Sequence, residues 1–294
     1  MFTAMLAPFW FELLSLWHCL SARPISMEEL TLKRIEAFHR ALLQGGTPEL
    51  NISGQRVTTA AAIELVCALY EAKKGPSAIG IDASRQGMWK LICASGWPWS
   101  EAAQELEEGN CGLKISPTTT DGVAILPFVQ RMQRTLNASG YDSHFSRAVA
   151  GAFIEMAGNI SEHSLTSKPG MVGYEILNGR ITCCFADLGV GVLQSLRLNP
   201  KYEALQTSAQ ALDEAMKTGV SRFTDSGRGY GFADLLRAIT EQWGLARLRT
   251  GQAKVIFDRT TESRTKIAGY CPELPGLQIV FSCDATSPST NYSL

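Results

Sequence analysis

The most informative stretch of this chain is EMAGNISEH, at residues 155–163. Glu155, Asn159 and His163 recur at every fourth position, so a helix places them in one row on one face. A carboxylate, an amide and an imidazole fill a hydrophobic core poorly, whereas together they suit a metal–phosphate group. A solvated helix face is the alternative explanation for this stretch taken alone.

A second motif follows a predicted strand. Residues 180–186, RITCCFA, are apolar and β-prone, and this run ends at Asp187. The dipeptide Asn178-Gly179 before it favours a two-residue hairpin that pairs the strand with residues 171–177. Gly189 and Gly191 follow, and glycines let the backbone pass close to a ligand. Asp with Gly usually marks only a turn, and the position after a strand makes this motif more specific.

A third motif, GRGYG at residues 227–231, precedes an apolar-periodic run at residues 232–243. Glycines that open a helix leave bare amides and a positive dipole end directed at an anion. Arg228 adds a positive charge, although an exposed arginine is more often simply solvated. The segment between the second and third motifs has a suitable length for a lid, and residues 221–226 are its expected hinge.

The three motifs in this order resemble the GHKL superfamily of ATP-binding domains, which includes gyrase-type ATPases, histidine kinases and the anti-sigma-factor serine kinases. The order E-x-x-x-N-x-x-x-H is closest to the anti-sigma kinase branch. The resemblance implies ATP and Mg²⁺ as cofactors, with Glu155 as the catalytic base and Asn159 as the metal ligand. It also implies that Asp187 binds the adenine amino group, and His163 has either a phosphate or a structural contact. The expected ATP-binding residues are Asn159, His163, Asp187, Gly189, Gly191, Gly227, Arg228, Gly229 and Gly231.

The fold that follows from this resemblance is α/β, with a C-terminal two-layer α/β sandwich of the Bergerat type over residues 127–294. Helices are expected at residues 127–138 and 143–162, the second capped by Asp142. The family commonly opens its last strand with Gly-Thr. Here Leu277 stands at the Thr position after Gly276, and Thr250-Gly251 is the alternative. Either the adenine pocket is completed differently, or the strand lies elsewhere.

Residues 27–112 predict a separate small α/β domain. Helices are expected at residues 28–43, 59–73 and 88–94, and strands at 50–54 and 78–82. The sequence Asp82-Ala83-Ser84 loosely resembles STAS domains, although residues 85–88 lack their phosphoacceptor. Residues 101–117 are acidic and then marked by Gly and Pro, which is typical of a linker, and we place the linker between the domains at 113–126.

Residues 1–26 form a hydrophobic N-terminal segment that is rich in aromatic side chains in its first 20 residues. This part is short for a membrane span and lacks the basic start of a secretory signal. An interfacial or partner-binding segment, or a true start at Met27, is the favoured interpretation, and membrane contact through residues 1–20 is the alternative.

Composition restricts the function classes further. The net charge is −1, which gives no electrostatic footprint for nucleic acid. The eight cysteines form no C-x-x-C pair and no Cys/His cluster at zinc spacing, so a reducing cytoplasm fits best.

Three function classes stay open. The favoured class is an anti-sigma-like serine/threonine kinase or ATP-dependent switch that acts on an unidentified regulatory protein. The second is an ATPase of the gyrase or chaperone sort, and the third is a nucleotide-sensing module with little catalysis. A homodimer is kept as a further alternative. A sensor histidine kinase is disfavoured, because His39 lacks the usual acidic residue directly after it.

Overall fold

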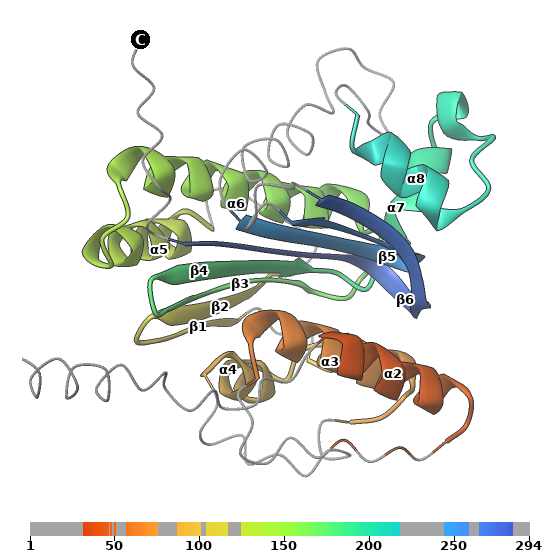
Figure 1. Ribbon diagram of the computed structural model, residues 1–294, viewed down its shortest axis with the longest axis horizontal. Helices are drawn as coiled ribbons and strands as arrows, with labels where there is room; N and C mark the ends of the chain where they lie inside the picture. The colour runs from red at the N-terminus through yellow and green to blue at the C-terminus, as the bar shows by residue number, and fades with distance from the viewer. Residues whose placement is uncertain are drawn as a thin grey trace, which may run out of the picture.

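A mixed α/β fold is built on one antiparallel sheet. The computed structural model describes residues 32–46, 48, 50, 57–75, 87–100, 104–116, 125–217, 244–258 and 265–284. Within them, six strands form the sheet in the order β1-β2-β3-β4-β6-β5, with every neighbouring pair antiparallel. Helices cover both faces of the sheet (Figure 1). The strands are β1 Gln104–Glu108, β2 Cys111–Ser116, β3 Gly170–Leu177, β4 Arg180–Ala186, β5 Gly244–Asp258 and β6 Thr265–Asp284.

The central hairpin of the sheet confirms the prediction from Asn178-Gly179. Strands β3 and β4 pair from Met171 with Ala186 to Leu177 with Arg180. Asn178 and Gly179 have φ values of +51° and +74°. Two left-handed turn residues match the right-handed twist of the strands, so this dipeptide fixes the register of the hairpin.

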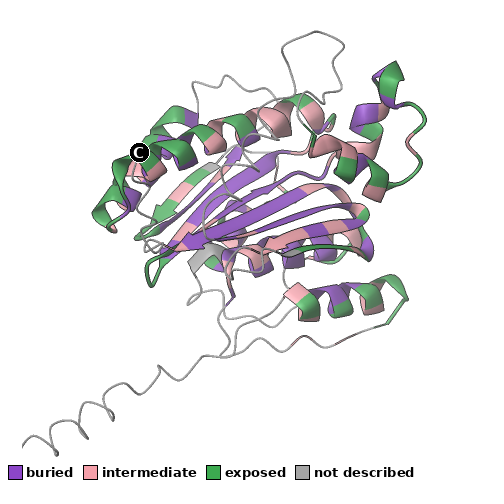
Figure 2. Cartoon of the chain, turned by 45° about the horizontal axis from the view of Figure 1, so that its top comes forward, coloured by how far each residue is buried: buried purple, intermediate pink, exposed green. Residues whose placement is uncertain are grey.

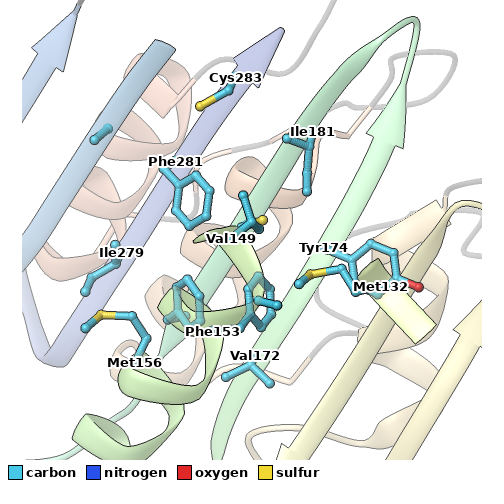
Figure 3. Packing of buried hydrophobic residues seen from close by; sticks show 14 of the residues in the cluster. Met132, Val149, Phe153, Met156, Val172, Tyr174, Ile181, Ile279, Phe281 and Cys283 are labelled. Atoms are coloured by element: carbon cyan, nitrogen blue, oxygen red, sulfur yellow. The ribbon is translucent and has the colours of Figure 1, made fainter. Parts of the chain in front are cut away.

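Helices α5 (Leu126–Ala138) and α6 (Ser143–His163) pack on one face of the sheet, as expected. Asp142 caps α6 by accepting hydrogen bonds from the amides of His144 and Phe145 at 2.8 and 3.0 Å. Val149, Phe153 and Met156 of α6 lie over the strands (Figure 3). The Phe153 ring is 4.6 Å from that of Phe185 on β4, between centroids. Burial of this apolar stripe holds α6 on the sheet.

Helices α2 (Leu32–Leu43), α3 (Thr59–Glu71) and α4 (Gly87–Ser95) lie on the opposite face, and the prediction of these helices is confirmed within the described residues. Ile63 and Val66 of α3 share one hydrophobic cluster with Cys184 and Val280 of the sheet. Sheet, α5 and α6 make two layers, and α2–α4 add a third, so the sheet is largely buried between them (Figure 2). The predicted strand at 78–82 and Asp82-Ala83-Ser84 lie outside the described residues, as do residues 51–54 of the other predicted strand.

The predicted linker is wrong at residues 113–116, because these residues belong to strand β2. Strand β2 pairs with β1 on one side and with β3 on the other. Leu113 and Ile115 are buried against the α2–α4 layer, while the acidic side chains of β1 form ion pairs at the surface, such as that of Glu105 with Lys114. The alternation of apolar and charged residues is typical of a hairpin at the edge of a sheet. The acidic residues of this hairpin favoured the interpretation as a linker.

The segment after β4 forms short helices at one end of the sheet: α7 (Gly191–Arg197), a 3-10 turn at Pro200–Tyr202 and α8 (Ser208–Ala215). Thr207 and Gln210 cap the start of α8 reciprocally. Residues 1–26 and the predicted hinge at 221–226 lie outside the described residues. Among the helices that are described, none has the length and apolar character needed to cross a membrane.

Candidate functional site

The polar row on α6 turns gradually from solvent toward the body of the protein. Glu155 is exposed, and Asn159 and His163 are half-buried. Four residues advance the helix by about 40° beyond one full turn, so successive members of the row rotate toward the packed face. The His163 Nδ1 atom lies 3.3 Å from Oγ of Ser195 on α7. The structure therefore keeps the three side chains on one side of α6, with His163 in contact with the segment after β4.

Asp187 follows the last residue of β4 and is 5% exposed. Its Oδ1 accepts a hydrogen bond from the Gly189 amide at 2.8 Å, and its Oδ2 accepts one from the Leu277 amide at 3.3 Å. Burial raises the pKa of this carboxyl to about 6, although both amide hydrogen bonds favour the charged form. Each carboxylate oxygen keeps acceptor capacity beyond these bonds, so Asp187 can receive a further donor.

The end of α6 contacts the loop that carries Gly189 and Gly191. The Val190 amide donates to the Ser164 carbonyl at 2.9 Å. A Cβ on Gly189 would lie 1.9 Å from that same carbonyl oxygen, so only glycine fits there. The Ser164 hydroxyl is buried and has no hydrogen-bond partner within the described residues. This contact brings the first and second motifs together.

Gly191 opens α7 with a φ of +73°, and a Cβ there would lie 2.8 Å from Oγ1 of Thr250. The close approach that Gly189 and Gly191 permit in this structure is therefore to the protein's own chain. Their contact with a base or sugar stays a prediction.

The two candidate positions for the threonine of the resembled family, Leu277 and Thr250, lie next to each other beside this loop. Thr250 on β5 lies directly opposite Leu277 on β6. The Thr250 hydroxyl donates to the Gly276 carbonyl at 2.8 Å and accepts from the Val192 amide at 3.1 Å. Thr250 thus joins the start of α7 to the turn that precedes Leu277, so the two candidate positions belong to one site.

Sequence reasoning missed the contribution of Gln278, which is 2% exposed. Its Nε2 donates to the carbonyls of Asp187 and Pro275 at 3.2 and 2.8 Å. Its Oε1 is buried without a hydrogen-bond partner in the described part of the chain. A lone glutamine in a strand carries no motif, and only the sheet register places it beside Asp187.

The third motif is not placed, because Gly227, Arg228, Gly229 and Gly231 lie outside the described residues. No group of three or more His, Cys, Asp or Glu side chains that suits a metal is found in the residues that are described. Mg²⁺ usually keeps several waters and takes few protein ligands, so Asn159 with Glu155 one turn earlier remains compatible with this ion.

The assembled site has a buried carboxylate and the Ser164 hydroxyl, which has no hydrogen-bond partner among the described residues. Half-buried polar side chains line the adjacent face of α6. Leu165 and Val190 add apolar side chains that are 47% and 40% exposed. A comparison of the chain with models of known protein families finds no match, and a comparison with curated proteins finds none either.

Proposed function

We propose that this protein binds Mg-ATP, and that the sheet with α5 and α6 forms a Bergerat-type nucleotide site. The supporting observation is the position of Asp187 at the end of β4, buried and next to the end of α6. Two backbone amides hold its carboxylate, and Gly189 packs on Ser164. A carboxylate of this kind accepts a hydrogen bond from an exocyclic amine, which is the group that distinguishes adenine.

The surrounding residues fit a nucleotide in this proposal. The Ser164 hydroxyl, which lacks a hydrogen-bond partner in the described part of the chain, provides a further polar contact. Leu165 and Val190 provide exposed apolar surface for a flat ring. Asn159 supplies a hard oxygen ligand for Mg²⁺ on the same face of α6 as Glu155. Bound ATP supplies a transferable phosphoryl group, and Glu155, which is exposed, is available to orient or deprotonate the attacking hydroxyl or water.

The favoured function is an anti-sigma-like serine/threonine kinase or ATP-dependent switch that acts on a regulatory protein. The order Glu155, Asn159, His163 favours this class. A GHKL ATPase and a non-catalytic nucleotide sensor are the alternatives. A measurement of ATP turnover distinguishes these two, because only the ATPase hydrolyses ATP.

Calorimetric titration with ATP tests the proposal. We expect binding that requires Mg²⁺ in the wild-type protein and is lost in Asn159→Ala. Asn137→Ala changes an exposed asparagine on α5 and serves as the matched control. Wild-type protein that binds no ATP, or an Asn159→Ala variant that binds as the wild type does, would contradict the proposal.

Replacement of Glu155 by alanine should leave the ATP affinity within about twofold and reduce turnover by roughly 10²-fold or more, because a general base acts only in the chemical step. Turnover is measured as phosphate release, or as phosphate transfer to a protein partner. Glu162→Ala removes another exposed carboxylate of α6 and should retain activity. Full turnover in Glu155→Ala would remove this residue from the catalytic role.

A further inference from the structure

A buried ionic layer joins α2 and α3 to strand β5 on the sheet face opposite α6. Glu64 of α3 is 1% exposed and forms ion pairs with Arg247 and Arg249, which are 2% and 0% exposed. Glu36 of α2 binds Arg247 at 2.9 Å and Lys254 at 2.6 Å. Loss of one partner from such a layer leaves a charge buried without compensation, so its members hold one another in place.

Arg249 connects this layer to the turn beside Asp187. One end of its guanidinium binds Glu64, and the other donates to the carbonyl of Pro272. The next residue, Thr250, donates to the carbonyl of Gly276. Gln278 lies directly opposite Arg249 and donates to the carbonyl of Pro275. Three neighbouring side chains of the β5–β6 pair therefore hold three carbonyls of one short segment, residues 272–278.

This segment contains a β-bulge that lies next to Asp187. Thr250 pairs with Leu277 and Gly251 pairs with Leu274, so the strand register gives Pro275 and Gly276 no opposite residue on β5. Gly276 has a φ of +74°, and a Cβ there would lie 2.1 Å from the Asp187 carbonyl oxygen. A small shift of the bulge would therefore move the Leu277 amide relative to the Asp187 carboxylate to which it donates.

We propose that Glu64 is a positioning residue for the nucleotide site. By holding Arg249, it fixes the bulge at residues 272–278 against Asp187, and so it sets the preference for adenine from the opposite face of the sheet. The inference rests on the proposed ATP binding. Because coupling between sites is reciprocal, bound nucleotide must also stabilise the contact of α3 with β5.

The test compares the dissociation constants of ATP and inosine triphosphate, which carries a carbonyl oxygen where ATP carries the amine. Glu64→Gln should lower the preference for ATP by about tenfold relative to the wild type, which lies in the lower part of the usual coupling range of about 5–150-fold. Glu36→Gln is the matched control, since Glu36 also forms an ion pair with Arg247, whereas the ion pair of Arg249 among the described residues is with Glu64. Its preference should stay within about twofold of the wild-type value.

Arg249→Lys gives a second variant in case Glu64→Gln does not fold. Lysine keeps the charge facing Glu64 but lacks the fork that reaches the Pro272 carbonyl, so the preference should fall similarly. An unchanged preference in the folded variants, or an equal loss in Glu36→Gln, would overturn the inference. Wild-type protein that binds no ATP would instead refute the function on which it rests.

Hydrogen exchange on the wild-type protein provides a measurement that needs no variant. Saturating Mg-ATP should slow exchange of amides in α3 as well as at Leu277 and Val192. Protection at Leu277 and Val192 without any change in α3 would overturn the inference, because the two faces would then be uncoupled.

Discussion

At the scale of single residues, two buried ionisable groups, His39 and Asp187, change the stability of the fold in opposite directions as the pH changes. His39 on α2 is 0% exposed, and neither ring nitrogen has a hydrogen-bond partner among the described residues. Burial and, to a smaller extent, the positive charge of Arg249 together lower its pKa to about 4. Burial raises the pKa of Asp187, so both groups favour the uncharged form in the folded protein.

The His39 shift predicts a pH dependence of stability. The folded pKa is below the unfolded value of about 6.5, so the stabilisation is present above pH 6.5 and is lost as the pH falls toward 4. The full effect is about 3 kcal/mol. His39→Leu should therefore show a smaller fall in unfolding free energy between these pH values, as measured by urea denaturation.

The exposed His144 on α6 gives the control for this experiment, since His144→Leu should keep the wild-type profile. Identical pH profiles for His39→Leu and the wild type would show that burial of His39 does not control this part of the stability curve.

At the scale of helices and strands, the sequence predicts best where one local feature decides the geometry. Asn178-Gly179 specifies the hairpin of β3 and β4, and Asp142 specifies the start of α6. The ionic layer could not be predicted, because Glu64 and Arg247 are 183 positions apart and meet only after the sheet forms. Pairing across strands likewise places Gln278 and Thr250 at the site, and no pattern along the chain contains that information.

Asp142→Ala should lower the unfolding free energy by about 1 kcal/mol, because two amides at the start of α6 lose their acceptor. Asp142→Ser restores an acceptor at the same place and should recover most of that loss. Urea denaturation at neutral pH measures both changes. Equal stability of the alanine and serine variants would mean that the cap contributes little to α6.

At the scale of the whole molecule, the sheet is the shared core of the N-terminal and C-terminal parts of the chain. Strands β1 and β2 extend it at one edge, and α2–α4 cover the face opposite α6. The sequence predicts the helices in both parts, but the single sheet with two covered faces follows from long-range pairing of β2 with β3. The proposed nucleotide site thus has helices on both sides of the strands that build it.

This arrangement predicts that a chain truncated to residues 127–294 does not fold as the full chain does. The truncation would expose Met171, Cys184 and Val280, which are buried against the α2–α4 layer. We expect no cooperative thermal transition and strong binding of a hydrophobic dye. A chain of residues 27–294 retains every described element and should keep the transition. Cooperative unfolding of 127–294 alone would show that its core is independent of the N-terminal helices.

We propose that the Asp187 carboxylate recognises adenine in a nucleotide site. The most direct test is calorimetric titration of Mg-ATP into wild-type protein and Asp187→Ala, with the thermal midpoint of each recorded to confirm folding. A hydrogen bond to a charged acceptor contributes roughly 1.5–3 kcal/mol, so the affinity of the variant should fall by at least tenfold. A folded Asp187→Ala variant that binds ATP as tightly as the wild type would contradict the claim.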